Sequence, residues 1–278
     1  MSEYKAGEKV AFILGASSGI GEAAALLFAK GGYTVYAASR RAKAPEGIKN
    51  IIPLKIDASD EESIALGVSL IIKEKGRIDV LVYAAGNGLA GPVEGTSAMD
   101  ALSQFEVNFF GCLKTLNAVL LHMRSRRSGS IILIGSVGGR VTVPFQTLYS
   151  SSKAALAALS DGLRQELKQF NIKVTLVEPG DVQTGFPDSR RVLNIIDEYK
   201  AEFKSALYNM EHDERTGMKP EVVAKAIYKA AEQSNPPSRI VVNFSFRLIT
   251  FFLRLLPVCL VERIVRSMYI NTKGGLGN

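Results

Sequence analysis

Short apolar runs alternate with longer amphipathic stretches along most of the chain. The short runs are apolar at nearly every position, which is typical of strands whose two faces are both covered by helices. Seven such runs occupy residues 10–14, 34–38, 51–56, 80–84, 130–134, 173–177 and 240–243. Their alternation with helical stretches predicts βαβ units, and hence an α/β fold with a doubly wound parallel sheet of about seven strands.

Apolar residues spaced three and four positions apart predict the helices between these strands. The helices are expected over residues 20–30, 61–75, 99–123, 149–170 and 220–233. Residues 183–217 are less regular and rich in aromatic and charged side chains, and they follow a strand that ends before Pro179 and Gly180. We expect this segment to form a partly helical lid over a ligand.

Residues 246–270 carry a different pattern, in which apolar runs are interrupted by Arg254 and Pro257. No uncharged run there approaches the roughly 20 residues that a membrane-spanning helix needs. The pattern predicts two amphipathic helices separated at Pro257. We therefore expect a single domain over residues 1–245, with the lid inside it, and an amphipathic C-terminal extension over residues 246–278.

The composition indicates a folded chain with an uneven charge. Of the 278 residues, 47% are hydrophobic and 22% are charged, which supplies a core and excludes disorder as the main state. The net charge is +7, and residues 247–278 hold five basic residues, including Lys273, against Glu262 alone. Because these basic residues are interleaved with aliphatic ones, without a recognition helix or stacking aromatics, nucleic acid is not an expected partner.

The extension has two interpretations that the sequence leaves open. Its arginines could face lipid phosphates while neighbouring Phe and Leu side chains enter the membrane interface. These arginines are Arg247, Arg254, Arg263 and Arg266. The same pattern is also explained by packing against the chain's own subunit or against an oligomer partner.

The cysteines and the first residues bear on location. Cys112 and Cys259 are too few for the disulfide framework of a secreted scaffold. Residues 1–8 are polar and lack the features of a signal peptide. We expect a cytoplasmic protein, with peripheral membrane contact through the extension as the open alternative.

A glycine-rich turn follows the first predicted strand and opens the first predicted helix. It reads Gly15-Ala16-Ser17-Ser18-Gly19-Ile20-Gly21. Glycines let the backbone approach a ligand closely, and the helix N-terminus offers free N–H groups to a pyrophosphate. In this position the turn predicts dinucleotide binding, with an ordinary βα turn as the alternative.

Two arginines, Arg40 and Arg41, follow the second predicted strand, where an NAD-specific site places a carboxylate on the ribose hydroxyls. A guanidinium can instead bind the additional 2′-phosphate of NADP. The position favours NADP(H) over NAD(H), with a solvated basic turn as the alternative.

Tyr149 and Lys153 lie four residues apart in a predicted helix and therefore share one face. A free tyrosine has a pKa of about 10, and a neighbouring ammonium lowers it, so the pair is suited to acid–base chemistry. Ser136 follows the fifth predicted strand, where its hydroxyl could bind a substrate oxygen.

With these motifs the chain resembles the short-chain dehydrogenase/reductase family. The resemblance covers about residues 8–243. It rests on Gly15-x-x-x-Gly19-Ile20-Gly21, Asn108, Ser136, Tyr149-x-x-x-Lys153 and Pro179-Gly180-x-Val182-x-Thr184. It implies a Rossmann-type subunit, with hydride transfer between NAD(P) and an alcohol or carbonyl, and no metal ion is expected.

The resemblance also implies roles for four residues. Tyr149 would be the general acid in reduction and the base in oxidation, and Ser136 would orient the reacting oxygen. Lys153 would lower the pKa of Tyr149 and hold the nicotinamide ribose. Asn108 would kink its helix and support a proton relay from Lys153 through water.

The implied cofactor site is larger. It comprises Gly15, Ser17, Ser18, Gly19, Ile20, Gly21, Arg40, Arg41, Asp57, Ala85, Gly86, Asn108, Tyr149, Lys153, Pro179, Val182 and Thr184. Within it, Asp57 would contact the adenine, and Val182 and Thr184 the nicotinamide carboxamide.

The chain departs from the family at two places. The glycine motif usually begins with Thr, where this chain has Leu14, and the fourth strand is usually followed by Asn-Asn-Ala-Gly, where this chain has Tyr83-Ala84-Ala85-Gly86. We interpret the joint loss of two polar residues as a matched change to apolar packing between the first and fourth strands.

The expected substrate is a bulky apolar ketone or alcohol such as a steroid, a retinoid or a long acyl chain. Its contacts would be Ser136, Val143, Tyr149 and Phe186. Apolar walls at the pocket entrance are expected from Leu89, Val93, Val141, Val143, Phe145, Phe186, Val192, Leu193 and Ile196. Reduction of a 3-oxoacyl thioester or an acylglycerone phosphate is the alternative activity, and a non-catalytic dinucleotide sensor is an alternative of another class.

The family also implies a homodimer or homotetramer. Its subunits often meet through the helix that carries Tyr149. In this chain that helix has four alanines, Ala154, Ala155, Ala157 and Ala158, which would allow close approach.

Overall fold

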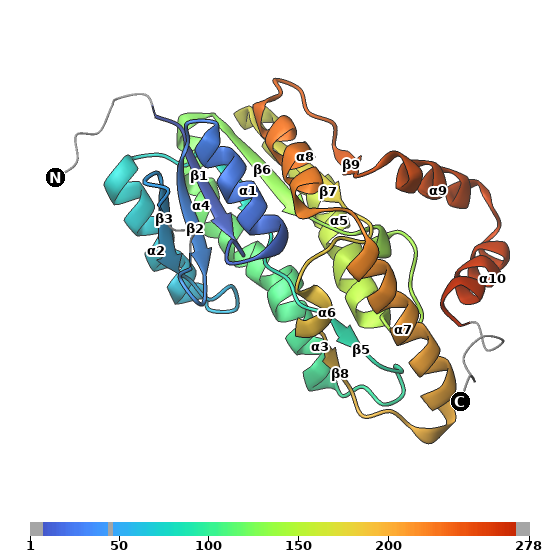
Figure 1. The fold of residues 1–278 in the computed structure, drawn as a ribbon. Helices are drawn as coiled ribbons and strands as arrows, with labels where there is room; N and C mark the ends of the chain where they lie inside the picture. Colours follow the sequence, from blue (N-terminus) through green and yellow to red (C-terminus); the bar gives the residue numbers. More distant parts are fainter. Residues whose placement is uncertain (1–7, 44–46, 271–278) are drawn as a thin grey trace.

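The computed structural model describes residues 8–43 and 47–270 (Figure 1). Lys273 and most of the polar N-terminal stretch considered above lie outside these residues. The centre is a seven-stranded sheet in which every pair of neighbours is parallel. In spatial order its strands are β3 (Ile51–Lys55), β2 (Thr34–Ser39), β1 (Val10–Leu14), β4 (Val80–Tyr83), β6 (Gly129–Ile134), β7 (Ile172–Glu178) and β9 (Arg239–Val241).

Helices cover both faces of this sheet (Figure 1). One face packs against α2 (Glu61–Lys75), α4 (Gly111–Arg126) and α5 (Thr147–Leu167), and the other against α1 (Gly19–Lys30) and α8 (Pro220–Glu232). Alternate residues of β1 enter the two cores, with Phe12 on the first face and Ile13 on the second. The prediction of a doubly wound parallel sheet is therefore confirmed.

The strand order reverses between β1 and β4, because β1 pairs with β2 on one side and with β4 on the other. In such sheets the crevice outside the carboxyl ends of the strands at this point binds ligands. The glycine turn follows β1 directly, so the fold places it at that crevice.

The helix predicted over residues 99–123 is interrupted in the structure. It consists of α3 (Ala98–Phe105), a five-residue π-helical segment (Glu106–Phe110) and α4. A π-helical turn adds one residue to the helical repeat, which rotates the side chains that follow it. Here the π-helical segment carries Asn108, which is fully buried.

The lid segment is partly helical, as predicted. It contains α6 (Phe186–Ser189), β8 (Arg191–Val192) and α7 (Lys200–Thr216). β8 pairs with β5 (Leu89–Ala90) in a separate two-stranded sheet. The lid is thereby held to the segment that follows β4.

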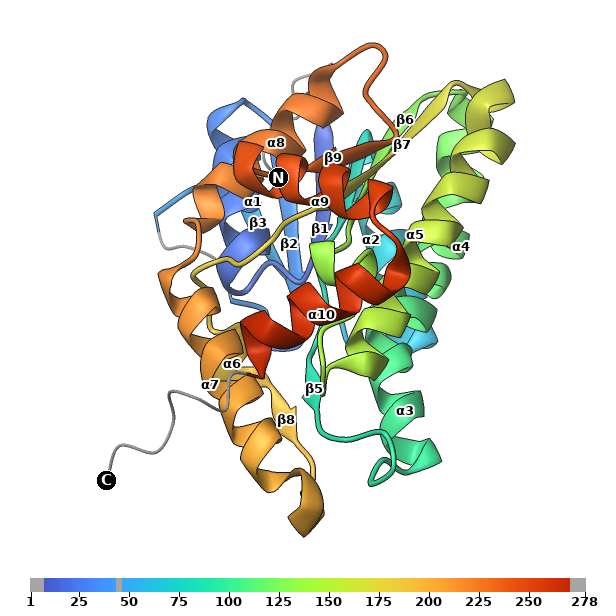
Figure 2. The ribbon, with the colours of Figure 1, turned by 90° about the vertical axis from the view of Figure 1, so that its right-hand side faces the viewer.

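The C-terminal extension forms α9 (Phe244–Leu255) and α10 (Val258–Tyr269), with Pro257 between them as predicted. The expected domain boundary at residue 245 falls inside α9. The end of α10 lies beside α7 (Figure 2), where Asn209 donates a hydrogen bond to the Tyr269 carbonyl at 3.0 Å and Arg266 pairs with Glu202. Within residues 8–43 and 47–270, no helix is both long and apolar enough to cross a membrane.

Candidate active site

A pocket opens beyond the carboxyl ends of β6 and β7 and contains three of the four predicted catalytic residues: Ser136, Tyr149 and Lys153. Ser136 follows β6, whereas Tyr149 and Lys153 project from the first turns of α5. The ring of Tyr149 packs against Phe186, with 5.5 Å between the ring centroids. Tyr149, the proposed proton donor, therefore lies against an aromatic side of the pocket.

Burial raises the pKa of Tyr149 to about 12, and its hydrogen bond with Ser136 acts in the opposite direction with a smaller effect. The net shift is opposite to the lowering expected from Lys153, because the cost of desolvating a phenolate dominates and Lys153 is not among the groups that shift the Tyr149 pKa. The protein by itself thus keeps the phenol protonated near neutral pH, as a proton donor must be.

Lys153 is itself buried, and burial lowers its pKa to about 8. Its ammonium Nζ donates a hydrogen bond to the Ile134 carbonyl at 2.8 Å and lies 5.8 Å from the centroid of the Tyr149 ring. The β6 backbone consequently fixes the position of the amine beside the tyrosine.

Asn108 lies behind the pocket and is held at both ends of its amide. Its Oδ1 accepts from the Asn87 N–H at 2.9 Å, and its Nδ2 donates to Ser152 Oγ at 3.0 Å. A Cβ atom placed on Gly86 would lie 3.4 Å from Asn108 Oδ1 and 3.6 Å from Lys153 Nζ. Asn108 and Lys153 therefore meet at the same glycine, while the water relay between them stays a prediction.

Tyr83 contributes to this region in a way that the sequence analysis missed. Its side chain is buried, and its hydroxyl donates a hydrogen bond to the Val107 carbonyl at 2.5 Å, inside the π-helical segment. Leu14 and Tyr83 are partners in the β1–β4 register, and both are buried as the apolar interpretation implies. That interpretation was incomplete, because the tyrosine hydroxyl supplies a polar bond to the segment that carries Asn108.

The glycine turn has the backbone geometry that close approach requires. Gly15 has φ +95°, and a Cβ there would lie 2.5 Å from the Ala85 amide nitrogen. Gly19 has φ +58°, and a Cβ there would lie 3.0 Å from the Thr184 methyl group. Neither position tolerates a side chain without strain. The turn thus brings three predicted cofactor segments together.

The two arginines after β2 face different parts of the predicted cofactor site. Arg41 Nη2 donates a hydrogen bond to Ser17 Oγ in the glycine turn at 3.0 Å. The pKa of Asp57 is lowered chiefly by a hydrogen bond from the Ser59 backbone, with a contribution from the charge of Arg40. Arg41 therefore adjoins the glycine turn, and Arg40 adjoins the residue predicted to contact adenine.

The predicted site residues divide into two groups. Those that line the pocket are Ile20, Gly86, Ser136, Val143, Tyr149, Lys153, Pro179, Val182, Thr184 and Phe186. Those outside its lining are Gly15, Ser17, Ser18, Gly19, Gly21, Arg40, Arg41, Asp57, Ala85 and Asn108. An extended dinucleotide would need both groups, since its two ends lie on either side of the switch point.

The expected entrance residues need a correction. Val141, Val143 and Phe186 line the pocket, whereas the others do not. Leu89 and Val192 lie instead in the paired strands β5 and β8, where Leu89 aligns with Arg191 and Val192 with Ala90. Phe145 packs against aromatic rings of the lid. The residues outside the pocket lining are Leu89, Val93, Phe145, Val192, Leu193 and Ile196.

The missing wall comes from the C-terminal extension. The contributing residues of α9 and α10 are Phe246, Ile249, Leu253, Val265, Met268 and Tyr269. Phe246 packs over Gly180, where an added Cβ would lie 2.3 Å from the ring. The sequence held one signal for this contact, a glycine after Pro179, but gave no indication of its partner.

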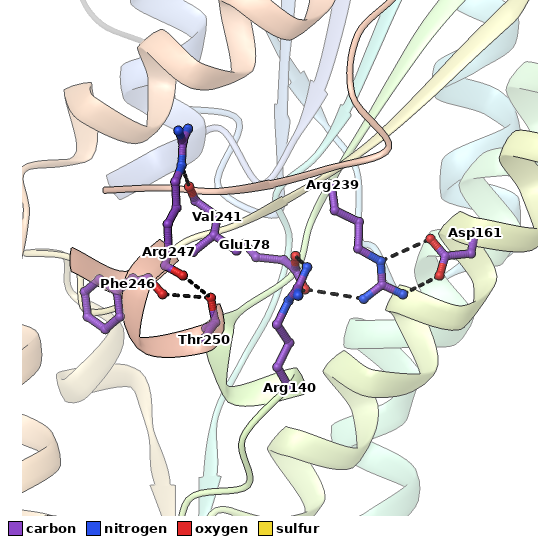
Figure 3. A network of polar contacts seen from close by, with 8 residues as sticks. All are labelled: Arg140, Asp161, Glu178, Arg239, Val241, Phe246, Arg247 and Thr250. Atoms are coloured by element: carbon purple, nitrogen blue, oxygen red, sulfur yellow. Dashed lines mark hydrogen bonds and ion pairs between the residues drawn. The ribbon is translucent and has the colours of Figure 1, made fainter. Parts of the chain in front are cut away.

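An ionic network surrounds the buried carboxylate of Glu178 (Figure 3). Glu178, only 1% exposed, ends β7 immediately before Pro179 and accepts two hydrogen bonds from Arg140, at 2.8 and 2.5 Å. Arg239 lies 3.7 Å from the same carboxylate and also binds Asp161 on α5. The network joins the loops after β6 and β7, which carry Ser136 and Gly180.

The fold and the site define the class of protein. Residues 9–192 match the family model described as short chain dehydrogenase, which is more than half of the chain. The chain belongs to the short-chain dehydrogenase family of oxidoreductases.

Two curated relatives are similar over most of their length. The 3-ketodihydrosphingosine reductase of Bacteroides thetaiotaomicron is 38% identical over 234 residues, covering 83% of this chain and 86% of that protein. Retinol dehydrogenase 8 of Homo sapiens is 34% identical over 270 residues, covering 88% of this chain and 85% of that protein.

Solved structures show the same fold. A short-chain dehydrogenase from Streptomyces avermitilis superimposes with a TM-score of 0.82 at 30% identity, covering 94% of this chain and 98% of that one. The structure of ElxO with NADP bound superimposes with a TM-score of 0.73 at 28% identity, covering 87% and 99%.

Proposed function

We propose that the chain reduces the ketone of a bulky, lipid-like substrate with NADPH, and catalyses the reverse oxidation with NADP. The observation that carries this proposal is the pocket itself, in which the hydroxyls of Ser136 and Tyr149 stand among apolar walls from the lid and from α9–α10. An apolar pocket with a few convergent polar groups is typical of a small-molecule site.

The chain's residues fit a dinucleotide. The positive φ angles of Gly15 and Gly19 and the N-terminus of α1 provide the cradle for a pyrophosphate. Arg40 and Arg41 directly follow β2, where an NAD-specific site places a carboxylate, and they support NADP(H) as the cofactor. The NADP in the related ElxO structure supports the same choice.

Each catalytic side chain has a proposed task. Tyr149 donates its phenolic proton to the substrate oxygen, and the high pKa imposed by burial keeps that proton available. Ser136 orients the oxygen, Lys153 holds the nicotinamide ribose, and Asn108 holds the backbone around Gly86. When bound, the reduced nicotinamide supplies the hydride for the carbonyl carbon.

The substrate class follows from the walls and from the relatives. Phe186, Leu253 and Val265 give the pocket aromatic and aliphatic sides. The relatives' names refer to a ketodihydrosphingosine and to retinol, which are both long apolar molecules with one oxygen to be reduced or oxidised. We propose a long-chain lipid ketone for this chain, and we assign α9–α10 to its catalytic domain.

The test is a screen in which purified protein and NADPH are given long-chain, retinoid and steroid ketones. Oxidation of NADPH is measured by its absorbance. Tyr149→Phe keeps the ring but removes the transferable proton, and we expect turnover to fall by about a hundredfold or more. Tyr208→Phe, at an exposed position, is the matched control and should keep wild-type turnover. Unchanged turnover of Tyr149→Phe would disprove the catalytic assignment.

We also propose that α9–α10 contacts the surface of a membrane. Large apolar side chains are exposed on both helices, among them Phe251, Phe252 and Leu255. Arg254 and Arg263 lie among them, and their charge suits anionic lipid. Since Ile249 and Met268 are exposed and also line the pocket, a lipid could pass from that surface to the site.

For the oligomeric state we propose a homodimer through α4 and α5. Ala154 and Ala158, one turn apart on α5, are exposed, as are Leu113 and Leu121 on α4. Small and apolar residues together support close helix packing between two copies. Light scattering of the wild type and of Ala158→Glu tests this, because a buried glutamate at that seam should give monomers.

A further inference from the structure

The apolar pocket has one acidic wall. Asp181 follows Gly180 directly, and Glu214 lies near the end of α7, and both line the same pocket as Tyr149 and Ser136. Both carboxylates also act on the Tyr149 phenol electrostatically, which places them close to the reacting group. The proposed reduction itself uses neither of them.

The two carboxylates are only partly satisfied by the protein. Glu214 pairs with Arg190, whose side chain is fully buried, but Glu214 Oε2 is buried with no hydrogen-bond partner in the described residues. For Asp181 the backbone carbonyl accepts a hydrogen bond from the Met218 N–H at 2.9 Å, while the carboxylate receives none from another residue described here. A buried carboxylate oxygen without a donor is costly, and a ligand can supply that donor.

The local charges leave a net negative wall. Arg190 compensates one of the two pocket carboxylates, and Asp213 adds a further negative charge close by. Burial together with Asp213 and Glu214 raises the pKa of Asp181 to about 6, as expected for a carboxyl group with no cation of its own. Lys153 also lines the pocket, but its ammonium is bound to the Ile134 carbonyl and is not among the charges that act on Asp181.

We infer that Asp181 and Glu214 bind a primary ammonium group beside the reacting carbonyl, so that the substrate is a long-chain 2-amino ketone. This inference rests on the proposed ketone reduction and narrows its substrate. An ammonium has three donors and fits two carboxylates at once. The relative whose name specifies a ketone of dihydrosphingosine, a long-chain amino alcohol, agrees with this chemistry.

The experiment compares two substrates that differ at one group. Wild-type protein and NADPH are given a long-chain 2-amino-3-ketone, or the counterpart with a hydroxyl in place of the ammonium. We expect kcat/KM to favour the amino ketone by at least about tenfold, since a charged hydrogen-bonded pair is lost in the counterpart. Asp181→Asn should bring the ratio of the two values close to one.

Controls separate this effect from structural damage. Glu214→Gln is a second variant, compared after its thermal unfolding has been measured because Arg190 loses its partner there. Asp188→Asn changes an exposed carboxylate that pairs with Arg215 outside the pocket, and it should keep the wild-type ratio. If neither substituted protein is folded, inhibition of the wild type by a long-chain primary amine, compared with the alcohol of equal length, gives the same readout.

The outcomes are distinct. Equal kcat/KM values of the wild type for the two ketones, or a ratio that folded Asp181→Asn and Glu214→Gln both retain, would overturn the inference and leave ketone reduction standing. In the inhibition arm, equal inhibition by the amine and the alcohol would likewise overturn it. Absence of NADPH oxidation with every ketone tested would instead contradict the proposed function.

Discussion

The hydroxyl of Tyr83 and the carbonyl of Val107 form a 2.5 Å hydrogen bond between β4 and the π-helical segment. The next residue, Asn108, has its amide bound to Asn87 and Ser152. Burial raises the pKa of Tyr83 well above its ordinary value, so the phenol stays a donor. This bond therefore fixes the backbone that positions the buried amide behind the site.

Tyr83→Phe should damage catalysis more than stability. Loss of one buried hydrogen bond should lower the free energy of unfolding by about 1–2 kcal/mol, and the displaced π-helical segment should lower kcat with little change in KM. Tyr36→Phe is the matched control, since it removes a buried-strand hydroxyl that donates to Glu74 at 2.6 Å, away from the pocket. Equal kcat values for the two variants would show that Tyr83 has no positioning role.

Much of the fold could be predicted because its pattern is local. All five residues of β1 are buried, so the apolar run shows directly that both faces are covered. α9 ends at Leu255 because a proline favours an extended conformation in the residue before it, here Leu256 before Pro257. The π-helical segment could not be predicted, since a shift of the apolar positions by one residue is hard to tell from the ordinary alternation of three- and four-residue spacings in a helix.

The site shows the same division. Tyr149 and Lys153 could be paired from their spacing on one helix. Tertiary packing alone brings Phe246 onto Gly180 and places Glu214 in the pocket that contains Asp181. The direction of the Tyr149 pKa shift is set by burial, which cannot be inferred from the spacing of Tyr149 and Lys153 in the sequence.

Glu178→Gln should destabilise the protein strongly. The substitution leaves the partly exposed guanidinium of Arg140 with a neutral partner in place of a carboxylate that is 1% exposed, and loss of a charged hydrogen bond costs about 1.5–3 kcal/mol. Arg239, which also contacts Glu178, forms a more exposed ion pair with Asp161. Asp161→Asn weakens that pair and should cost about 1 kcal/mol or less. Urea unfolding of both variants measures the difference, and similar losses would contradict the importance assigned to the buried carboxylate.

Arg41→Ala and Arg40→Ala should both weaken the preference for NADPH over NADH. Arg41 is fixed beside the glycine turn by Ser17, so we expect it to carry more of the 2′-phosphate contact, about tenfold or more in the ratio of Kd values. Lys43→Ala, two positions further along, serves as the control for loss of a nearby positive charge. A ratio unchanged in both arginine variants would refute the assignment of these residues to the phosphate.

Replacement of Phe251 and Phe252 by Ser should reduce binding to vesicles that contain anionic lipid. Each substitution removes a large exposed apolar ring that would otherwise enter the membrane interface. The partition coefficient of the protein between vesicles and water should therefore fall by about tenfold or more. Leu66→Ser removes an exposed apolar side chain on α2 and should leave binding unchanged. Co-sedimentation with vesicles of neutral and of acidic phospholipid measures both effects, and wild-type protein that stays in the supernatant would exclude the membrane contact.

Lys153→Met should change how stability depends on pH. The folded pKa of Lys153 is about 8, below its ordinary value of 10.5, so between these values the unfolded chain binds more protons than the folded one. The lysine's contribution to the free energy of unfolding therefore rises with pH across that window, by up to about 1.4 kcal/mol per pH unit. Below pH 8 the cost of burying the ammonium is fully present, and the methionine variant lacks it.

Tyr83 and Tyr149 also titrate at high pH, but they are common to both proteins and cancel in the comparison. Cys112 interacts electrostatically with Lys153, but burial raises its pKa far enough to keep the thiol neutral over the pH range compared. Urea unfolding of wild type and Lys153→Met at pH 7, 8 and 9.5 should thus show the wild type gaining stability relative to the variant above pH 8. A difference that is constant with pH would mean that the lysine is not depressed in the folded protein. The same variant should lose activity at every pH, because methionine cannot hold the ribose hydroxyls as Lys153 is proposed to do.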